Sequence, residues 1–151
     1  MNEQNSTSIT DARLIMYHKQ STSARTSFLR LGNGGVCAFE PFPTLAQVLG
    51  DGESDIDTPL VINHPAPLIA KVEQQLGMAA NSLVAEREFL EQVDIPGKIV
   101  TVYLARFTTM DPPHQIVATT GCRFGLLTEF RDLPPVELEL LRRAYKVIMG
   151  G

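Results

Sequence analysis

A chain of 151 residues with a formal net charge of −4 has the length of one domain and can bury a sizeable core. Hydrophobic residues make up 44% of it and charged residues 20%, a composition that excludes a wholly disordered protein. The thirteen Lys and Arg residues are scattered along the chain. They form no basic stripe of the kind that binds phosphate backbones, so we expect no nucleic-acid partner.

Targeting signals and cysteine motifs are also missing from the sequence. Residues 1–11 lack the basic flank and the apolar run of a signal peptide, and we expect a mobile tail there before a single domain over 12–151. No tract approaches the roughly 18 apolar residues that span a bilayer. Cys37 and Cys122 have no metal-ligand spacing, so we expect two reduced, buried thiols. These features favour a cytoplasmic protein with no membrane partner.

The first elements that the sequence predicts are strands. ARLIMYH, at 12–18, alternates apolar side chains, with Leu14 and Met16 on one face and Ile15 and Tyr17 on the other. Two further β-prone runs, at 27–31 and 36–40, flank the cluster GNGG. Glycine and asparagine tolerate positive φ, so the cluster predicts a hairpin. A phosphate loop would need a following helix, and a strand pattern follows instead.

The next stretch predicts short elements joined by a loop. Pro41 and Pro43 end the preceding strand, and Thr44 is expected to cap a short helix through Leu49. The loop GDGESDIDTP, at 50–59, is rich in acids, but it lacks the ligand order of a calcium loop and is expected to be solvated.

A strand and a helix are expected after this loop. LVI at 60–62 reads as a short strand, and His64 reads as a turn residue rather than a base. The helix begins near Pro67 and stops at Gly77. Its apolar residues recur at helical spacing: Leu68, Ile69, Val72 and Leu76.

The C-terminal third predicts a buried strand and a long helix. GCRFGLLTEF, at 121–130, reads as the strand, and the helix should begin near Pro135, which suits the first helical position. Apolar residues cover more than half of this helix, so it should pack against a sheet. The order of elements predicts an α+β domain with a mixed or antiparallel sheet, about three helices and the C-terminal helix on the sheet.

Residues 83–93 allow two interpretations. As a strand they alternate imperfectly, with a turn at Pro96 and Gly97 and a returning strand at 98–107 that is rich in β-branched and aromatic residues. As a helix they contain good helix formers, but Arg87 interrupts the apolar side. The strand and helix periodicities fit about equally well, so the sequence leaves both interpretations open.

The helical interpretation carries a family resemblance. REFLE at 87–91 resembles the core of the Nudix box, in which Arg, Glu, an aliphatic residue, any residue and two glutamates lie on a helix. That helix holds magnesium for attack on a nucleoside diphosphate. The following strand, an aromatic-bearing strand and a closing helix are also arranged as in that fold. The resemblance implies that Glu88 and Glu91 bind Mg²⁺ and that Arg87 orients them.

The sequence departs from the Nudix pattern at several positions. Gln92 stands in place of a glutamate, and Asp94 stands in place of the glycine that ends the helix. The upstream Gly and Glu of the box fall on Glu73 and Ala79. A lost carboxylate removes charge that Mg²⁺ needs, so the resemblance implies an impaired hydrolase.

A second candidate site lies in TTMDPPHQ, at 108–115. Asp111 precedes two prolines and must be extended, and His114 follows three residues later, so a carboxylate and an imidazole can meet as a catalytic pair. A rigid proline loop at a sheet edge explains the same residues without chemistry.

The sequence shows no complete catalytic constellation. The leading hypothesis is therefore a non-catalytic module that binds a small ligand or a protein, including a second copy docked on the exposed hairpin edge. The alternatives are a divergent Nudix-like hydrolase that uses Mg²⁺ and a hydrolase that uses Asp111 and His114.

Overall fold

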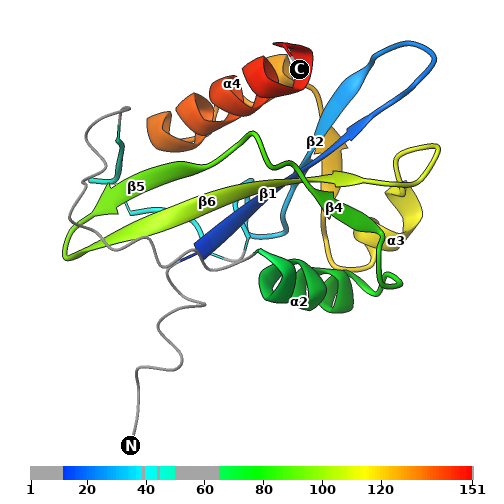
Figure 1. Cartoon of the computed structure of the whole chain (residues 1–151), viewed down its shortest axis with the longest axis horizontal. Helices are drawn as coiled ribbons and strands as arrows, with labels where there is room; N and C mark the ends of the chain where they lie inside the picture. The colour runs from blue at the N-terminus through cyan, green and yellow to red at the C-terminus, as the bar shows by residue number, and fades with distance from the viewer. Residues whose placement is uncertain (1–11, 39, 44, 50–64, 151) are drawn as a thin grey trace, which may run out of the picture.

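The computed structural model describes residues 12–38, 40–43, 45–49 and 65–150, which contain one mixed sheet and three α-helices (Figure 1). The predicted α+β class is confirmed. The seven strands are β1 (Ala12–Lys19), β2 (Thr26–Arg30), β3 (Gln47–Val48), β4 (Leu83–Ala85), β5 (Glu91–Ile95), β6 (Lys98–Phe107) and β7 (Arg123–Gly125). The helices are α2 (Ala66–Leu76), α3 (His114–Ala118) and α4 (Pro135–Gly150), with a 3-10 turn η1 (Leu127–Glu129).

The sheet is built around β1 and β6, which are parallel neighbours at its centre. The strand order is β3-β5-β6-β1-β2-β7, and β4 pairs with β6 beyond the end of β5. The other strand pairs are all antiparallel. The hairpin edge that was expected to be exposed is covered, because β7 pairs with β2 along Phe28 to Arg30. The outermost strands, β3 and β7, are only two and three residues long.

Two hydrophobic clusters lie on opposite faces of the sheet, and the alternation predicted for β1 divides its side chains between them. Ile15 and Tyr17 enter the cluster beneath α4, whereas Leu14 and Met16 enter the cluster beneath α2. Figure 1 shows α4 on one side of the sheet and α2 on the other, so β1 lies in a three-layer sandwich. Cys37 and Cys122 are both buried and free, as predicted.

Both long helices form where the sequence places them. α2 ends at Gly77, whose φ of +76° is the left-handed conformation that glycine adopts easily, and its N–H caps the carbonyl of Gln74. α4 begins at Pro135 and packs its apolar stripe on the sheet, confirming the predicted C-terminal helix; the buried stripe is Val136, Leu140, Leu141, Ala144 and Ile148. No helix in the described ranges combines the length and the apolar character that a membrane crossing needs.

The glycine-rich turn forms, but the predicted hairpin partner is wrong. The N–H of Leu31 donates to the carbonyl of Gly35 at 2.8 Å, which closes the turn. The chain then leaves β2 and returns beside β1, where Leu14 and Ala38 exchange both backbone hydrogen bonds. β2 is free to pair with β7 because this segment takes over the edge of β1.

Two other predicted elements differ from the structure. The helix expected through Leu49 is replaced by strand β3, which pairs with β5 through Val48 and Val93. The strand expected over 121–130 stops at Gly125, and the chain turns back through η1 so that Phe130 packs against that glycine. Thr44, the tail 1–11, the acidic loop, the strand at 60–62 and His64 lie outside the described residues.

Residues 83–93 form no helix, so the helical interpretation is wrong: 83–85 and 91–95 are strands, and 86–90 connect them. Both β4 and β5 pair with β6, the strand that Pro96 and Gly97 join to β5. Five residues, 86–90, lie between Ala85 and Glu91, but only two lie between their partners Ala105 and Val102 on β6. The three extra residues make a large bulge.

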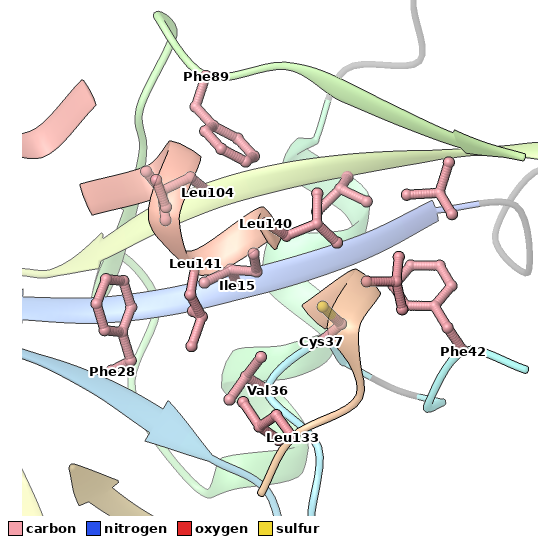
Figure 2. Close-up of a cluster of buried hydrophobic side chains, with 14 of the residues drawn as sticks. Ile15, Phe28, Val36, Cys37, Phe42, Phe89, Leu104, Leu133, Leu140 and Leu141 are labelled. Atoms are coloured by element: carbon pink, nitrogen blue, oxygen red, sulfur yellow. The ribbon is translucent and has the colours of Figure 1, made fainter. Parts of the chain in front are cut away.

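The bulge fills part of the core. Figure 2 shows Phe89 pointing from the bulge into the cluster that contains Leu104 and Leu140. Phe89 is only 2% exposed, whereas Leu90 beside it is 54% exposed. Burial of this aromatic side chain overrides the helix propensity of the surrounding glutamates and leucine, since it stabilises the fold by about 2–3 kcal/mol.

Candidate functional site

The two glutamates expected to bind magnesium do not meet. Glu88 is exposed in the bulge, and Glu91 lies on β5, where its carboxylate accepts a hydrogen bond from Arg143 at 2.7 Å. Within the described ranges, no group of three or more His, Cys, Asp or Glu side chains is placed to hold a metal ion. Glu91 is therefore an ion-pair partner of α4.

The Nudix pattern needs a helix that ends in glycine, and α2 has such an end at Gly77. With that glycine fixed, the arginine and the first glutamate of the pattern fall on Ala70 and Lys71. The two later glutamates fall on Gln74 and Gln75. A hard cation such as Mg²⁺ prefers carboxylate oxygens, and this helix offers none at the positions of the pattern.

The expected pair of Asp111 and His114 is not joined by a hydrogen bond in the described structure. The Asp111 carboxylate accepts a long hydrogen bond, 3.4 Å, from Nε2 of Gln20. The His114 ring instead meets the ring of Phe124 edge to face, with centroids 5.5 Å apart. His114 belongs to a pocket to which Asp111 contributes no lining atom.

This pocket, which we call the sheet-end pocket, lies between the β1–β2 turn, β7 and the segment that leads into α3. It is a partly open hollow of about 300 Å³, the lower end of the range for small-molecule sites. Its walls carry one guanidinium, one carboxylate, one imidazole, one hydroxyl and one phenyl ring. The lining residues are Gln20, Arg25, Ser27, Pro112, His114, Phe124, Gly125, Leu126 and Glu129.

Arg25 is presented to the pocket by a closely hydrogen-bonded turn. The N–H of Gln20 donates to the carbonyl of Arg25 at 3.0 Å, and the N–H of Ala24 donates to the carbonyl of Gln20 at 2.9 Å. The Ser23 hydroxyl donates to Oε1 of Gln20 at 3.1 Å. Ala24 has a φ of +58°, a conformation that costs a residue with a Cβ about 1 kcal/mol. These contacts hold the turn in one shape.

The opposite wall is fixed by a close approach of Phe130 to Gly125. A Cβ added at Gly125 would lie 2.7 Å from the Phe130 ring, so only glycine fits at this position. The turn that follows is closed by Glu129, whose Oε1 accepts the N–H of Leu126 at 2.8 Å. Glu129 is therefore anchored by one oxygen while its side chain lines the pocket.

Beneath the pocket, a buried histidine ties the sheet to the loop after β6. Nε2 of His18 lies 2.8 Å from the carbonyl oxygen of Thr109, so Nε2 carries the proton, because a carbonyl only accepts. Nδ1 of His18 is buried and has no hydrogen-bond partner in the described structure. His18 pairs with Ser27 across β1 and β2, so the two side chains share one face of the sheet.

A second hollow, of about 520 Å³, lies along α4 beside Glu91 of β5. Its central cation is Arg143, which donates to Glu91 at 2.7 Å and to Glu139 at 2.9 Å. The hydrogen bond to Glu139, followed by that to Glu91, raises the pKa of Arg143. Because two carboxylates already neutralise this guanidinium, we interpret it as a tether between α4 and β5.

A third polar group joins the bulge to β1. The hydroxyl of Tyr17 donates to Oε2 of Glu86 at 2.5 Å, and Nε of Arg106 lies 3.9 Å from the same oxygen. Burial of Tyr17, together with the hydrogen bond to Glu86, raises the pKa of the phenol. Tyr17 is therefore a neutral donor that fixes the bulge and is not poised to lose a proton at neutral pH.

No protein-family model matches the chain, and no curated protein is significantly similar to it. Function therefore has to be argued from the sites themselves. The sequence drew attention to His114 but not to Arg25, Ser27, Phe124 or Glu129. These four residues come from separate turns and strands, and only their convergence in the fold marks the pocket.

Proposed function

We propose that this protein is a non-catalytic module that binds a small molecule in the sheet-end pocket. The observation that carries the proposal is the set of five chemically different side chains, from separate parts of the chain, that line one hollow of about 300 Å³, open to solvent on one side. Small-molecule sites typically combine an apolar wall with a few convergent polar groups. Phe124, Pro112 and Leu126 supply the wall, and the other side chains supply the polar groups.

The contacts of the polar groups support binding rather than catalysis. A nucleophilic serine needs a base within hydrogen-bond reach. Ser27 and His114 both line the pocket, but in the described part of the chain no hydrogen bond joins them. The imidazole of His114 is turned edge to face with Phe124 instead. The two glutamates that the Nudix resemblance assigns to Mg²⁺ are separated, because Glu88 is exposed in the bulge and Glu91 is paired with Arg143. Each of these features favours a binding module over a hydrolase.

The test is a screen of a chemically diverse library of small metabolites against the ¹⁵N-labelled protein. Binding should shift the amide signals of Ser27, Phe124 and Leu126 together, because these residues share the pocket. Ser27→Leu should abolish those shifts, since leucine places an apolar side chain in the space. Thr128→Leu, an exposed position in η1 that does not line the pocket, is the matched control. A library without a single compound that shifts these amides would refute the proposal.

A further inference from the structure

We infer that the ligand of the sheet-end pocket is a small zwitterion of the amino-acid class, with its carboxylate on Arg25 and its ammonium on Glu129. This inference rests on the proposed function, and it adds the chemistry of the ligand. It follows from a pocket that holds one cation and one carboxylate, neither of them paired with an opposite charge in the described structure.

The guanidinium of Arg25 is the group that would bind the carboxylate of the ligand. Two arginines elsewhere in the fold are engaged: Arg30 donates to Asp132, and Arg143 donates to Glu91 and Glu139. Arg25 makes no ion pair and no side-chain hydrogen bond within the described part of the chain, although a tight turn holds its backbone. Guanidinium groups bind carboxylates through two parallel hydrogen bonds, so the exposed Arg25 side chain can bind one in this way.

The carboxylate of Glu129 is the group that would bind the ammonium of the ligand. One of its oxygens, Oε1, is taken by the N–H of Leu126, which fixes the group at the wall. Among the described residues, no basic side chain pairs with it. A carboxylate held in this way would repel a purely anionic ligand, and Arg25 would repel a purely cationic one. A ligand with both charges satisfies both groups.

Arg25 and Glu129 line the same pocket from different segments of the chain. Glu129 lies against Gly125, which pairs with Phe28 of β2. Arg25 precedes Phe28 by three residues, or about 10 Å along an extended chain. Within the described structure no ion pair joins Arg25 to Glu129, and both side chains are exposed, so each is available to a bound molecule. The ring of Phe124 gives the apolar part of that molecule a surface to pack on.

The experiment begins with the twenty common amino acids, each titrated into the ¹⁵N-labelled protein at pH 7. The amino acid that binds most strongly is then compared with its C-terminal amide, which lacks the carboxylate, and its N-acetyl derivative, which lacks the ammonium. Each derivative should bind at least about tenfold more weakly, because a lost hydrogen bond to a charged group costs about that factor. The shifts should appear at Ser27, Phe124 and Leu126.

Two variants assign the charges. Arg25→Gln should lower the affinity for the amino acid about tenfold. It should leave the affinity for the amide unchanged, because the amide has no carboxylate to pair with the guanidinium. Glu129→Gln should weaken the amino acid and leave the N-acetyl derivative unchanged, while its side-chain oxygen still accepts the N–H of Leu126. The matched controls are Arg87→Gln and Glu88→Gln, which change the same charges on the exposed bulge and should alter nothing.

Three results would overturn the inference. Equal affinity for the amino acid and both derivatives would show that the charges of the ligand do not contribute to binding. An unchanged affinity of Arg25→Gln for the amino acid would show the same. Shifts at the pocket with other library compounds, but with no amino acid, would reject the zwitterion and leave the proposed function intact. A pocket that responds to no compound at all would reject both.

Discussion

The carboxylate of Glu137, in the first turn of α4, accepts the backbone N–H of Val36 at 2.9 Å across 101 positions of sequence. Both residues are fully buried. Gly35 approaches the same carboxylate so closely that a Cβ there would lie 3.1 Å from Oε1. This contact joins the last helix to the segment that returns beside β1, and thus connects the start of α4 with the centre of the sheet.

Removal of the Glu137 side chain should destabilise the fold strongly. Glu137→Ala leaves the N–H of Val36 buried without an acceptor and opens a cavity, which together should cost about 2–4 kcal/mol. Glu137→Gln keeps an oxygen for that N–H and should cost at least about 1 kcal/mol less than alanine. Urea unfolding followed by circular dichroism measures both. Equal losses in the two variants would mean that the hydrogen bond contributes nothing.

Glu137 should also make stability depend on pH. Burial raises the pKa of this carboxyl above its usual 4.5, against the opposing effect of the backbone N–H groups of Val36 and Phe42. A raised folded pKa means that folding favours the protonated form. The protonated Glu137 carboxyl therefore adds to the free energy of unfolding. This stabilisation is complete below about pH 4.5 and is lost as the pH rises through the pKa of Glu137 in the folded protein.

The measurement is the difference in free energy of unfolding between wild type and Glu137→Gln at several pH values. The wild type should lose stability relative to the variant as the pH rises from 4 towards neutrality, because glutamine does not titrate. The comparison cancels the other carboxyl groups, which are shared. A difference that stays constant across this range, or that moves the other way, would contradict the assignment.

The elements that the sequence predicted correctly are those whose pattern is local. In β1 the alternation of Leu14 and Ile15 divides two apolar sets between two faces, and β1 is buried on both. The helix α2 has a helical repeat and a glycine stop, and α4 has a proline start. Such signals depend on neighbours within a few residues, so one sequence is enough to read them.

The elements that were wrong are those decided by distant contacts. The GNGG turn was predicted, but the strand after it pairs with Leu14 rather than with β2, because β7 competes for β2. The glutamates at 86–91 favour a helix by propensity, yet β6 supplies a partner and Phe89 is pulled into the core. The pocket belongs to the same category, since Arg25 and Glu129 meet one space only through the β2–β7 pairing.

The wall of the sheet-end pocket should tolerate no side chain at position 125. Gly125→Ala would place a Cβ 2.7 Å from the ring of Phe130, a rigid group that is itself buried. Overpacking of this kind typically costs about 1–3 kcal/mol. Gly150→Ala, near the end of α4 with no atom within 4 Å of the added Cβ, is the control and should not destabilise the protein. Thermal unfolding of the two variants checks this; equal melting temperatures would show that Phe130 moves freely.

The hydrogen bond from Tyr17 to Glu86 should make the fold sensitive to alkali. Burial and the contact with Glu86 raise the pKa of Tyr17 above its usual 10.0. Folding therefore favours the neutral phenol, and this stabilising contribution, complete below about pH 10, is lost as the pH rises through the folded pKa. Tyr17→Phe should cost about 1.5–3 kcal/mol at pH 7, because one hydrogen bond to a charged group is removed.

Stability measured at pH 7 and above pH 10 distinguishes the hydrogen bond of Tyr17 from the packing of its ring. Above pH 10 the stability difference between wild type and Tyr17→Phe should shrink, since phenylalanine has no proton to lose. Tyr103, whose pKa is raised by burial alone, provides the control. In the Tyr103→Phe background, the stability difference caused by Tyr17→Phe should still shrink above pH 10. A difference between wild type and Tyr17→Phe that is the same at pH 7 and pH 11 would show that Tyr17 ionises equally easily in the folded and unfolded chains. The bulge would then be held by Phe89 and not by the hydrogen bond to Glu86.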